Sequence, residues 1–141
     1  MKTSAEGIDF IKSFEQCRLT AYKPTPDDVW TCGWGSTKGV TESTCWTQEQ
    51  ADMALLQDVM EAEKCVGKCV RVPLTQNEFD ALVSLTFNIG CGAFAGSTLL
   101  KLLNNYDYDG AAQQILRWDK QAGRPLAGLT RRRQAEKEMF G

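Results

Sequence analysis

The sequence contains no histidine, and this absence limits the chemistry that the chain can perform. Ser-His-Asp triads, Cys-His pairs and zinc sites that use imidazole are excluded. General acid–base catalysis would then depend on carboxylates, tyrosine, lysine or cysteine. One carboxylate is unusually placed: Glu15 lies in the last turn of a predicted first helix, where the helix dipole disfavours negative charge. This placement favours a functional role for Glu15. The alternative is that exposure to water makes the unfavourable interaction with the helix dipole negligible.

The elements that would position Glu15 follow from caps, glycines, prolines and hydrophobic periodicity. Thr3-x-x-Glu6 reads as a capping box and predicts a helix over residues 4–16. Residues 18–46 are interrupted by prolines and glycines, which predicts a small hairpin or three-stranded sheet, the only β region in the chain. Everything after Thr47 reads as helical, with further capping boxes at residues 47–50 and 75–78. Asp109 precedes another apolar stripe, and a last helix is predicted over residues 130–140.

These elements predict an α+β fold with two unequal lobes. At 141 residues the chain has room for one domain, and neither an internal repeat nor a long linker divides it. We expect a small β lobe over residues 18–46 and a helical lobe over residues 47–141 that also takes up the first helix. The helix after Thr47 would face the core with a stripe formed by Leu55, Leu56, Val59 and Met60. A ligand would bind in a cleft between the lobes.

Charge and hydropathy exclude several classes of protein. The net charge is −2, so no global basic field favours nucleic acid, although residues 111–141 carry +4 and residues 1–110 carry −6. The N-terminal stretch lacks the apolar run of a secretory signal, and no window approaches 18 apolar residues. We therefore expect synthesis in the cytoplasm, no membrane insertion, and release by another factor if the protein acts elsewhere.

The six cysteines do not form a recognisable metal motif, because paired C-x₂-C spacing is absent. Cys65 and Cys69 stand four residues apart, a spacing that suits a disulfide on a regular helix poorly. An even count allows 15 full pairings, between which the sequence does not choose. We expect free thiols with an occasional bridge, and neither a metal nor a cofactor.

Several separate motifs resemble the phage-type lysozymes, the endolysins of glycoside hydrolase family 24. Members of that family read E-G-x-R-L-x-A-Y and then W/P-T-I-G-Y/W-G near the start, a central helix, and a terminal G-L-x-x-R-R-x-x-E segment. The corresponding segments here are residues 14–22 (FEQCRLTAY), 30–35 (WTCGWG), 71–84 (RVPLTQNEFDALVS), 87–90 (FNIG) with 93–100, and 128–136. The resemblance covers nearly the whole chain, and it implies a lysozyme-like fold and cleavage of the β-1,4 bond between N-acetylmuramic acid and N-acetylglucosamine in peptidoglycan.

By this resemblance Glu15 is the general acid, a role that requires it to hold a proton near neutral pH through burial against apolar walls such as Phe14 or Trp34. Arg132 would orient the acid. The family pattern places an Asp or Cys after eight residues and a Thr after five more, which makes Thr31 the residue that positions water. Here Pro24 stands at the Asp position, and the span from Glu15 to Thr31 is one residue longer than the pattern.

An insertion in this loop is the simplest account of the altered spacing. It makes Asp28 the favoured second catalytic residue, with Asp27, or neither, as alternatives. An Asp-Asp pair after proline is also typical of a turn that caps its own backbone, and that role can hold for one Asp while the other is catalytic. The family's separation of these groups implies inversion at the anomeric carbon.

Further residues have both a structural and a functional interpretation. Trp34 would stack on a saccharide or belong to the core, and Asn88 would lie in a loop and bind an N-acetyl group. Gly33 and Gly35 would take positive φ angles or form a tight strand connection. Ser36 stands where many members carry His, a position that we expect to be structural. Besides the acid clamp, the arginines at 131–133 would form a solvated helix face or attract an anionic cell wall.

The resemblance also implies the biological setting: a bacteriolytic hydrolase, expected to be monomeric, that reaches the periplasm with the help of a holin and lyses the host cell. Three alternatives stay open on the sequence. A wall-binding module would keep the fold without the chemistry, a lytic transglycosylase would cut the same bond and leave a 1,6-anhydro end, and a nucleic-acid binder would use the arginine run. Host range is not encoded in any motif that we identify.

Overall fold

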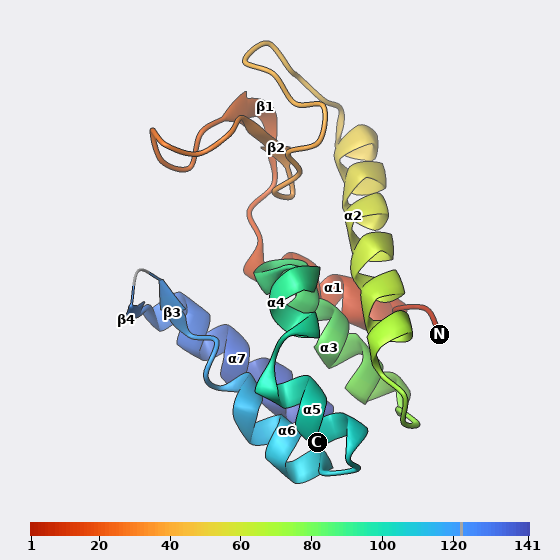
Figure 1. The fold of residues 1–141 in the computed structure, drawn as a ribbon. Helices are drawn as coiled ribbons and strands as arrows, with labels where there is room; N and C mark the ends of the chain where they lie inside the picture. The colour runs from red at the N-terminus through yellow and green to blue at the C-terminus, as the bar shows by residue number, and fades with distance from the viewer. Residues whose placement is uncertain (122) are drawn as a thin grey trace. The chain divides into compact units, whose positions relative to one another are not determined.

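The computed structural model describes residues 1–121 and 123–141. Its secondary structure is mostly helical, with two short pairs of strands (Figure 1). The helices are α1 (Ala5–Phe14), α2 (Gln48–Cys69), α3 (Gln76–Ile89), α4 (Cys91–Ala95), α5 (Thr98–Asn104), α6 (Tyr108–Ile115) and α7 (Ala127–Phe140). The strands are β1 (Arg18–Tyr22), β2 (Thr31–Gly33), β3 (Lys120–Gln121) and β4 (Arg124–Pro125). The predicted α+β class with a small N-terminal sheet is confirmed.

The described residues form two compact units. We call Asp9–Met60 the sheet unit, and Met1–Ile8 together with Glu61–Gly141 the helical unit. The helices α1 and α2 each contribute residues to both units. The division of the chain into lobes at residues 18–46 and 47–141, within a single domain, stays a prediction.

The sheet unit is built on an antiparallel pair of strands, β1 and β2. Arg18 pairs with Gly33 and Tyr22 with Thr31, and the register shifts between these two pairs. An isolated bridge between Thr20 and Cys45 adds the following loop to the outer side of β1. The sheet therefore has two strands, in agreement with the hairpin interpretation rather than the three-stranded one. The apolar core of this unit includes Ile11, Cys32, Ala51, Leu55 and Val59.

A tight turn follows β2 and packs on α2. Cys32 and Ser36 bridge each other across it, and both Gly33 (φ 65°) and Gly35 (φ 103°) take positive φ. A Cβ atom on Gly33 would lie 3.1 Å from Trp46 and Ala51, so only glycine fits here. The buried Ser36 hydroxyl donates to Asp58 Oδ2 at 2.7 Å, which agrees with a structural role for that position.

The helical unit has its core between α3 and α7, and α6 packs against both α5 and α7 (Figure 1). Every residue of α3 from Phe79 to Thr86 is buried, so this part of the helix is enclosed on all sides. Buried side chains from the other helices complete this core: Val66, Phe94, Leu99, Leu103, Ile115 and Phe140. A disulfide between Cys65 and Cys91 joins α2 to the start of α4, while the other four cysteines are free thiols.

Two of the three predicted capping boxes are confirmed. Thr47 and Gln50 exchange side-chain and backbone hydrogen bonds at the start of α2, and Thr75 and Glu78 do so at α3. The third is wrong by one residue, because the hydroxyl of Ser4, not Thr3, accepts from the Gly7 backbone N–H. Asp80 explains the shift: its carboxylate binds both the backbone N–H and the hydroxyl of Ser4, which fixes Ser4 as the cap.

Other expectations need correction. The last helix, α7, begins at Ala127, before the predicted residue 130. Asp107 caps α6, and Asp109 lies in its first turn. The strands β3 (Lys120–Gln121) and β4 (Arg124–Pro125) pair antiparallel, so the N-terminal sheet is not the only β structure. Leu56 and Met60 are half exposed instead of buried, because the inward face of α2 is narrower than its sequence pattern suggests. No helix in the described part of the chain is both long and apolar enough to cross a membrane.

Candidate active site

Glu15 follows directly after the last residue of α1. Its backbone N–H bonds to the Lys12 carbonyl at 3.2 Å, so the chain continues the helical turn as far as the proposed acid. The side chain is half-buried. A Cβ atom on Gly35 would lie 3.7 Å from Glu15 Oε2, which places the Glu15 carboxyl group beside the turn that follows β2. A half-buried carboxyl held against backbone is suited to proton transfer in a protected site.

Thr31 lies at the start of β2 and is buried. Its hydroxyl donates to the Val29 carbonyl at 3.1 Å. Because a hydroxyl has one proton and two lone pairs, Thr31 Oγ1 can then only accept from a further partner. A water bound to it would donate one hydrogen to Thr31 and keep its own lone pairs for attack.

Asp27 and Asp28 lie in an exposed loop between β1 and β2. Asp28 closes a turn on Thr25 twice: its backbone N–H bonds to the Thr25 carbonyl at 3.0 Å, and its Oδ2 accepts from the Thr25 hydroxyl at 2.9 Å. The turn interpretation of the Asp-Asp pair therefore applies to Asp28. A carboxylate has about four lone-pair sites, so this single bond leaves Asp28 able to accept a proton from water.

Trp34 lies in the tight turn after β2 and is half-buried. Its indole N–H donates to Asp52 Oδ1 at 2.7 Å, and the ammonium of Lys12 lies 5.3 Å from the ring centroid. Saccharide stacking on Trp34 stays a prediction, and the contact with Lys12 shows that part of the ring is already engaged. The hydrogen bonds from Trp34 and then Gln48 hold the pKa of the Asp52 carboxyl below its ordinary value.

Asn88 is exposed in the last turn of α3, so the expectation that it lies in a loop is wrong. The helix continues through Asn88 to Ile89 and ends at Gly90, whose φ of 93° favours glycine. An N-acetyl contact from Asn88 would therefore come from a helix terminus. That contact stays a prediction.

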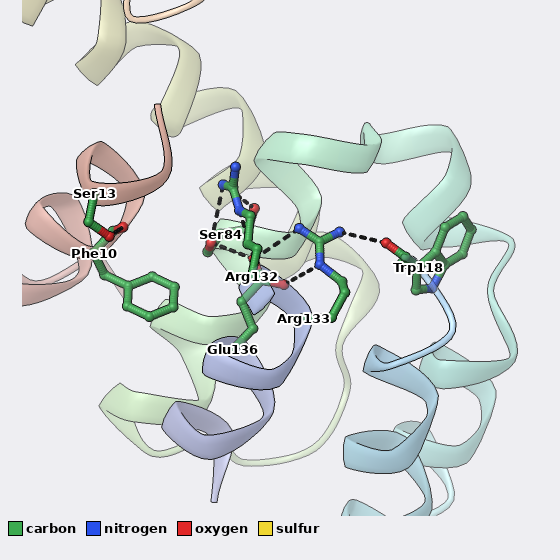
Figure 2. A network of polar contacts seen from close by, with 7 residues as sticks. All are labelled: Phe10, Ser13, Ser84, Trp118, Arg132, Arg133 and Glu136. Carbon is green, nitrogen blue, oxygen red and sulfur yellow. Dashed lines mark hydrogen bonds and ion pairs between the residues drawn. The ribbon is translucent and has the colours of Figure 1, made fainter. Parts of the chain in front are cut away.

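Arg132 and Arg133 are buried in α7, whereas Arg131 is exposed. Figure 2 shows both buried guanidinium groups directed at Glu136, which is 0% exposed. Arg133 Nε lies 2.7 Å from Glu136 Oε1, and Arg132 Nε lies 3.3 Å from Oε2. Ser84 Oγ also donates to Oε2, at 2.6 Å. A solvated face is thus the wrong interpretation for two of the three arginines.

Burial and neighbouring charges shift the pKa values of this cluster in opposite directions. Burial raises the pKa of the Glu136 carboxyl, and the neighbouring Arg133 and Arg132 cations act in the opposite direction. Burial also lowers the pKa of the Arg133 guanidinium. Because Arg133 contacts both carboxylate oxygens and Arg132 contacts Oε2, Glu136 is the anion that makes burial of the two arginines possible. Arg132 further donates to the carbonyl and hydroxyl oxygens of Ser84, each at 3.3 Å.

The sheet unit thus contains Glu15, Thr31, Trp34 and both candidate aspartates, and the helical unit contains Asn88 and Arg132. Sequence reasoning missed Asp52, because an acidic residue near a helix start is an ordinary surface pattern. Glu136 is the last residue of the terminal G-L-x-x-R-R-x-x-E segment, so the sequence singled it out without assigning it a role.

Comparison with known proteins places this arrangement in a family. A family model described as Phage lysozyme matches residues 12–136. The chain belongs to the phage lysozyme family. It is 44% identical to an endolysin of Acyrthosiphon pisum secondary endosymbiont phage 1, over 99% of this chain and 98% of that protein. An endolysin of Bacillus phage B103 is 41% identical over 99% of this chain, which spans only 54% of that longer relative.

Solved structures agree with this assignment. The muramidase domain of SpmX from Asticaccaulis excentricus superposes with a TM-score of 0.91 at 41% identity, covering 99% of this chain and 97% of that one. The lysozyme-like fold predicted from the motifs is confirmed. So is the predicted class of activity: this phage lysozyme is a glycoside hydrolase that degrades peptidoglycan.

Proposed function

We propose that this lysozyme hydrolyses the β-1,4 bond between N-acetylmuramic acid and N-acetylglucosamine with inversion, and that Glu15 is its general acid. The observation that carries the proposal is the half-buried Glu15 carboxyl beside Gly35, in the same unit as Thr31. Glu15 gives its proton to the bridging oxygen as the bond to the anomeric carbon breaks.

Water attacks the anomeric carbon from the opposite face. Thr31 Oγ1 accepts one hydrogen of this water, a role supported by the donation of its own proton to Val29. Asp28 takes the proton that the water loses, with Asp27 as the alternative base. The products are a new reducing end with inverted configuration and a free hydroxyl on the leaving sugar.

The remaining residues bind and orient. Arg132 orients Glu15, Asn88 binds an N-acetyl group, and Trp34 contacts a sugar ring. We propose that residues 1–141 act as one catalytic domain. The enzyme works as a monomer without a cofactor, does not bind nucleic acid, is made in the host cytoplasm, and acts on the wall in the periplasm after release with a holin.

Glu15→Gln tests the central claim. The substitution keeps the shape of the side chain but removes the transferable proton, so lysis of purified cell walls should fall at least about a hundredfold. Glu6→Gln, at an exposed position in the first turn of the same helix, is the matched control and should retain activity. A Glu15→Gln enzyme with near-native rates would contradict the proposal.

Three further measurements define the reaction. Asp27→Ala and Asp28→Ala, assayed side by side, identify the second carboxylate. Mass spectrometry of the fragments should show hydrated reducing ends, whereas 1,6-anhydro ends would indicate a lytic transglycosylase. Binding to peptidoglycan without any new reducing end would indicate a wall-binding module instead.

A further inference from the structure

The Asp52 carboxylate accepts two hydrogen bonds and forms an ion pair, and its three partners lie in separate segments of the sheet unit. Its Oδ1 accepts from the indole N–H of Trp34 at 2.7 Å and from the side-chain amide of Gln48 at 3.0 Å. The ammonium of Lys12 lies 3.9 Å from the same oxygen. Asp52 is in the second turn of α2, so these three contacts are all made to a regular helix.

These partners lie on either side of Glu15. Lys12 precedes Glu15 by three residues, and its carbonyl accepts the Glu15 backbone N–H. Gln48 also donates to the Cys17 sulfur at 3.6 Å, two residues after Glu15. Trp34 adjoins Gly35, the residue against which the Glu15 carboxyl lies. The α1 end, the start of β1 and the turn after β2 are therefore all connected to one carboxylate.

The strength of these contacts is sufficient to hold a geometry. A hydrogen bond from an indole N–H to an ionised carboxylate is stronger than a bond between neutral groups. Lys12 also lies over the Trp34 ring, at 5.3 Å from its centroid, which ties α1 to the turn independently of Asp52. Loss of Asp52 would leave the Trp34 N–H without its acceptor and would loosen the Trp34 side of the turn beside Glu15, while the Ser36–Asp58 hydrogen bond would still hold the turn to α2.

We propose that Asp52 is a positioning residue for Glu15. It holds Trp34, Lys12 and Gln48 in place around Glu15 and does not itself contact substrate. The inference rests on the proposed function, because it requires Glu15 to be the acid. Catalysis depends steeply on such placement, since displacement of a catalytic group by about 1 Å can cost about a hundredfold in rate.

Steady-state kinetics on soluble peptidoglycan fragments test this role. Asp52→Ala should lower kcat about tenfold, a partial loss of placement, and leave KM within about twofold. Asp52→Asn keeps an oxygen that can accept from Trp34, so it should stay within about threefold of the wild-type kcat. Trp34→Phe keeps an aromatic ring but loses the N–H that donates to Asp52. If the two residues act through this hydrogen bond, the double variant Trp34→Phe/Asp52→Ala should have the same kcat as Asp52→Ala or a higher one. Glu49→Gln removes a carboxylate from the same end of α2 and should change nothing.

Thermal unfolding of each variant separates positioning from folding, because rates are compared at temperatures where every variant is folded. An unchanged kcat in Asp52→Ala, equal losses in Asp52→Asn and Asp52→Ala, or additive losses in the double variant would each overturn the inference. Glu15→Gln in the same assay separates the two proposals. If it is inactive while Asp52→Ala is normal, only the positioning role fails, and if it is active, the proposed function fails together with this inference.

Discussion

Glu136→Gln should strongly destabilise the protein, because the Glu136 carboxylate is in direct contact with both buried arginines (Figure 2). Its Oε1 lies 2.7 Å from Arg133 Nε, and its Oε2 accepts from Ser84 at 2.6 Å. A glutamine amide has one acceptor and one donor group. Whichever way it turns, its NH₂ group meets a donor where the carboxylate had an acceptor.

The cost follows from what the substitution leaves behind. Arg133 is 0% exposed and Arg132 is 3% exposed, so neither guanidinium can regain hydration without a rearrangement of the core. Removing one partner of a buried ion pair costs about 3–5 kcal/mol. For a chain of this length that loss corresponds to a fall in Tm of roughly 10–17 °C.

Urea unfolding at neutral pH measures this cost through the shift in midpoint at an unchanged slope. Glu138→Gln, the same substitution at an exposed position of α7, should cost less than about 0.5 kcal/mol. Arg133→Met combined with Glu136→Leu should be less destabilising than Glu136→Leu alone, because it also removes one stranded cation. A loss below about 1 kcal/mol for Glu136→Gln would refute the reasoning, since it would show that solvent or another anion compensates the arginines.

Two further predictions concern stability. Alanine is a better helix former than glycine, but Gly7→Ala should lower the free energy of unfolding by about 1–3 kcal/mol, because its Cβ would lie 2.7 Å from Asp80 Cγ and from the side chain of Thr3. Gly128→Ala is the control, since its Cβ meets only the far end of Arg131 at 3.9 Å. Urea unfolding should show a lower free energy of unfolding for Gly7→Ala and a higher one for Gly128→Ala. Asp52→Asn should lower Tm near pH 7 but not in strong acid. The pKa of Asp52 is lower in the folded state than in the unfolded state, so its charge stabilises the fold at pH values above the unfolded pKa of about 3.9. This stabilisation is lost as the pH falls through the folded pKa. A Tm difference that persisted in strong acid would contradict the assigned electrostatics.

Local signals in the sequence were sufficient where no distant residue competed with them. The boxes at Thr47 and Thr75 formed as predicted, since both members of each box lie in one turn. At the first helix two candidate caps were adjacent, and the choice of Ser4 was made by Asp80, which lies 76 residues away. A contact of that separation leaves no local trace in the sequence.

The same limit explains why Asp52 was not predicted. Glu15 and Thr31 were proposed from family motifs, and their catalytic roles stay predictions. Asp52 contacts Trp34 and Lys12, which lie far from it in the sequence, and its own neighbours are typical of any amphipathic helix. The contacts of Glu136 with Arg132 and Arg133 are local, since these residues are three and four positions apart in α7. What the sequence did not show is the burial of this face of α7, which depends on its packing against α3.

The altered spacing between Glu15 and Thr31 has a physical account in the Thr25–Asp28 turn. The turn closes on itself through a backbone and a side-chain hydrogen bond, so it can hold an extra residue while Tyr22 still pairs with Thr31 across the sheet. The Thr25 hydroxyl limits the rotamers of Asp28, which favours a fixed geometry, and it donates to one of the two carboxylate oxygens. Asp27 is exposed in the same loop. Activity of the two alanine variants, rather than spacing, decides between them.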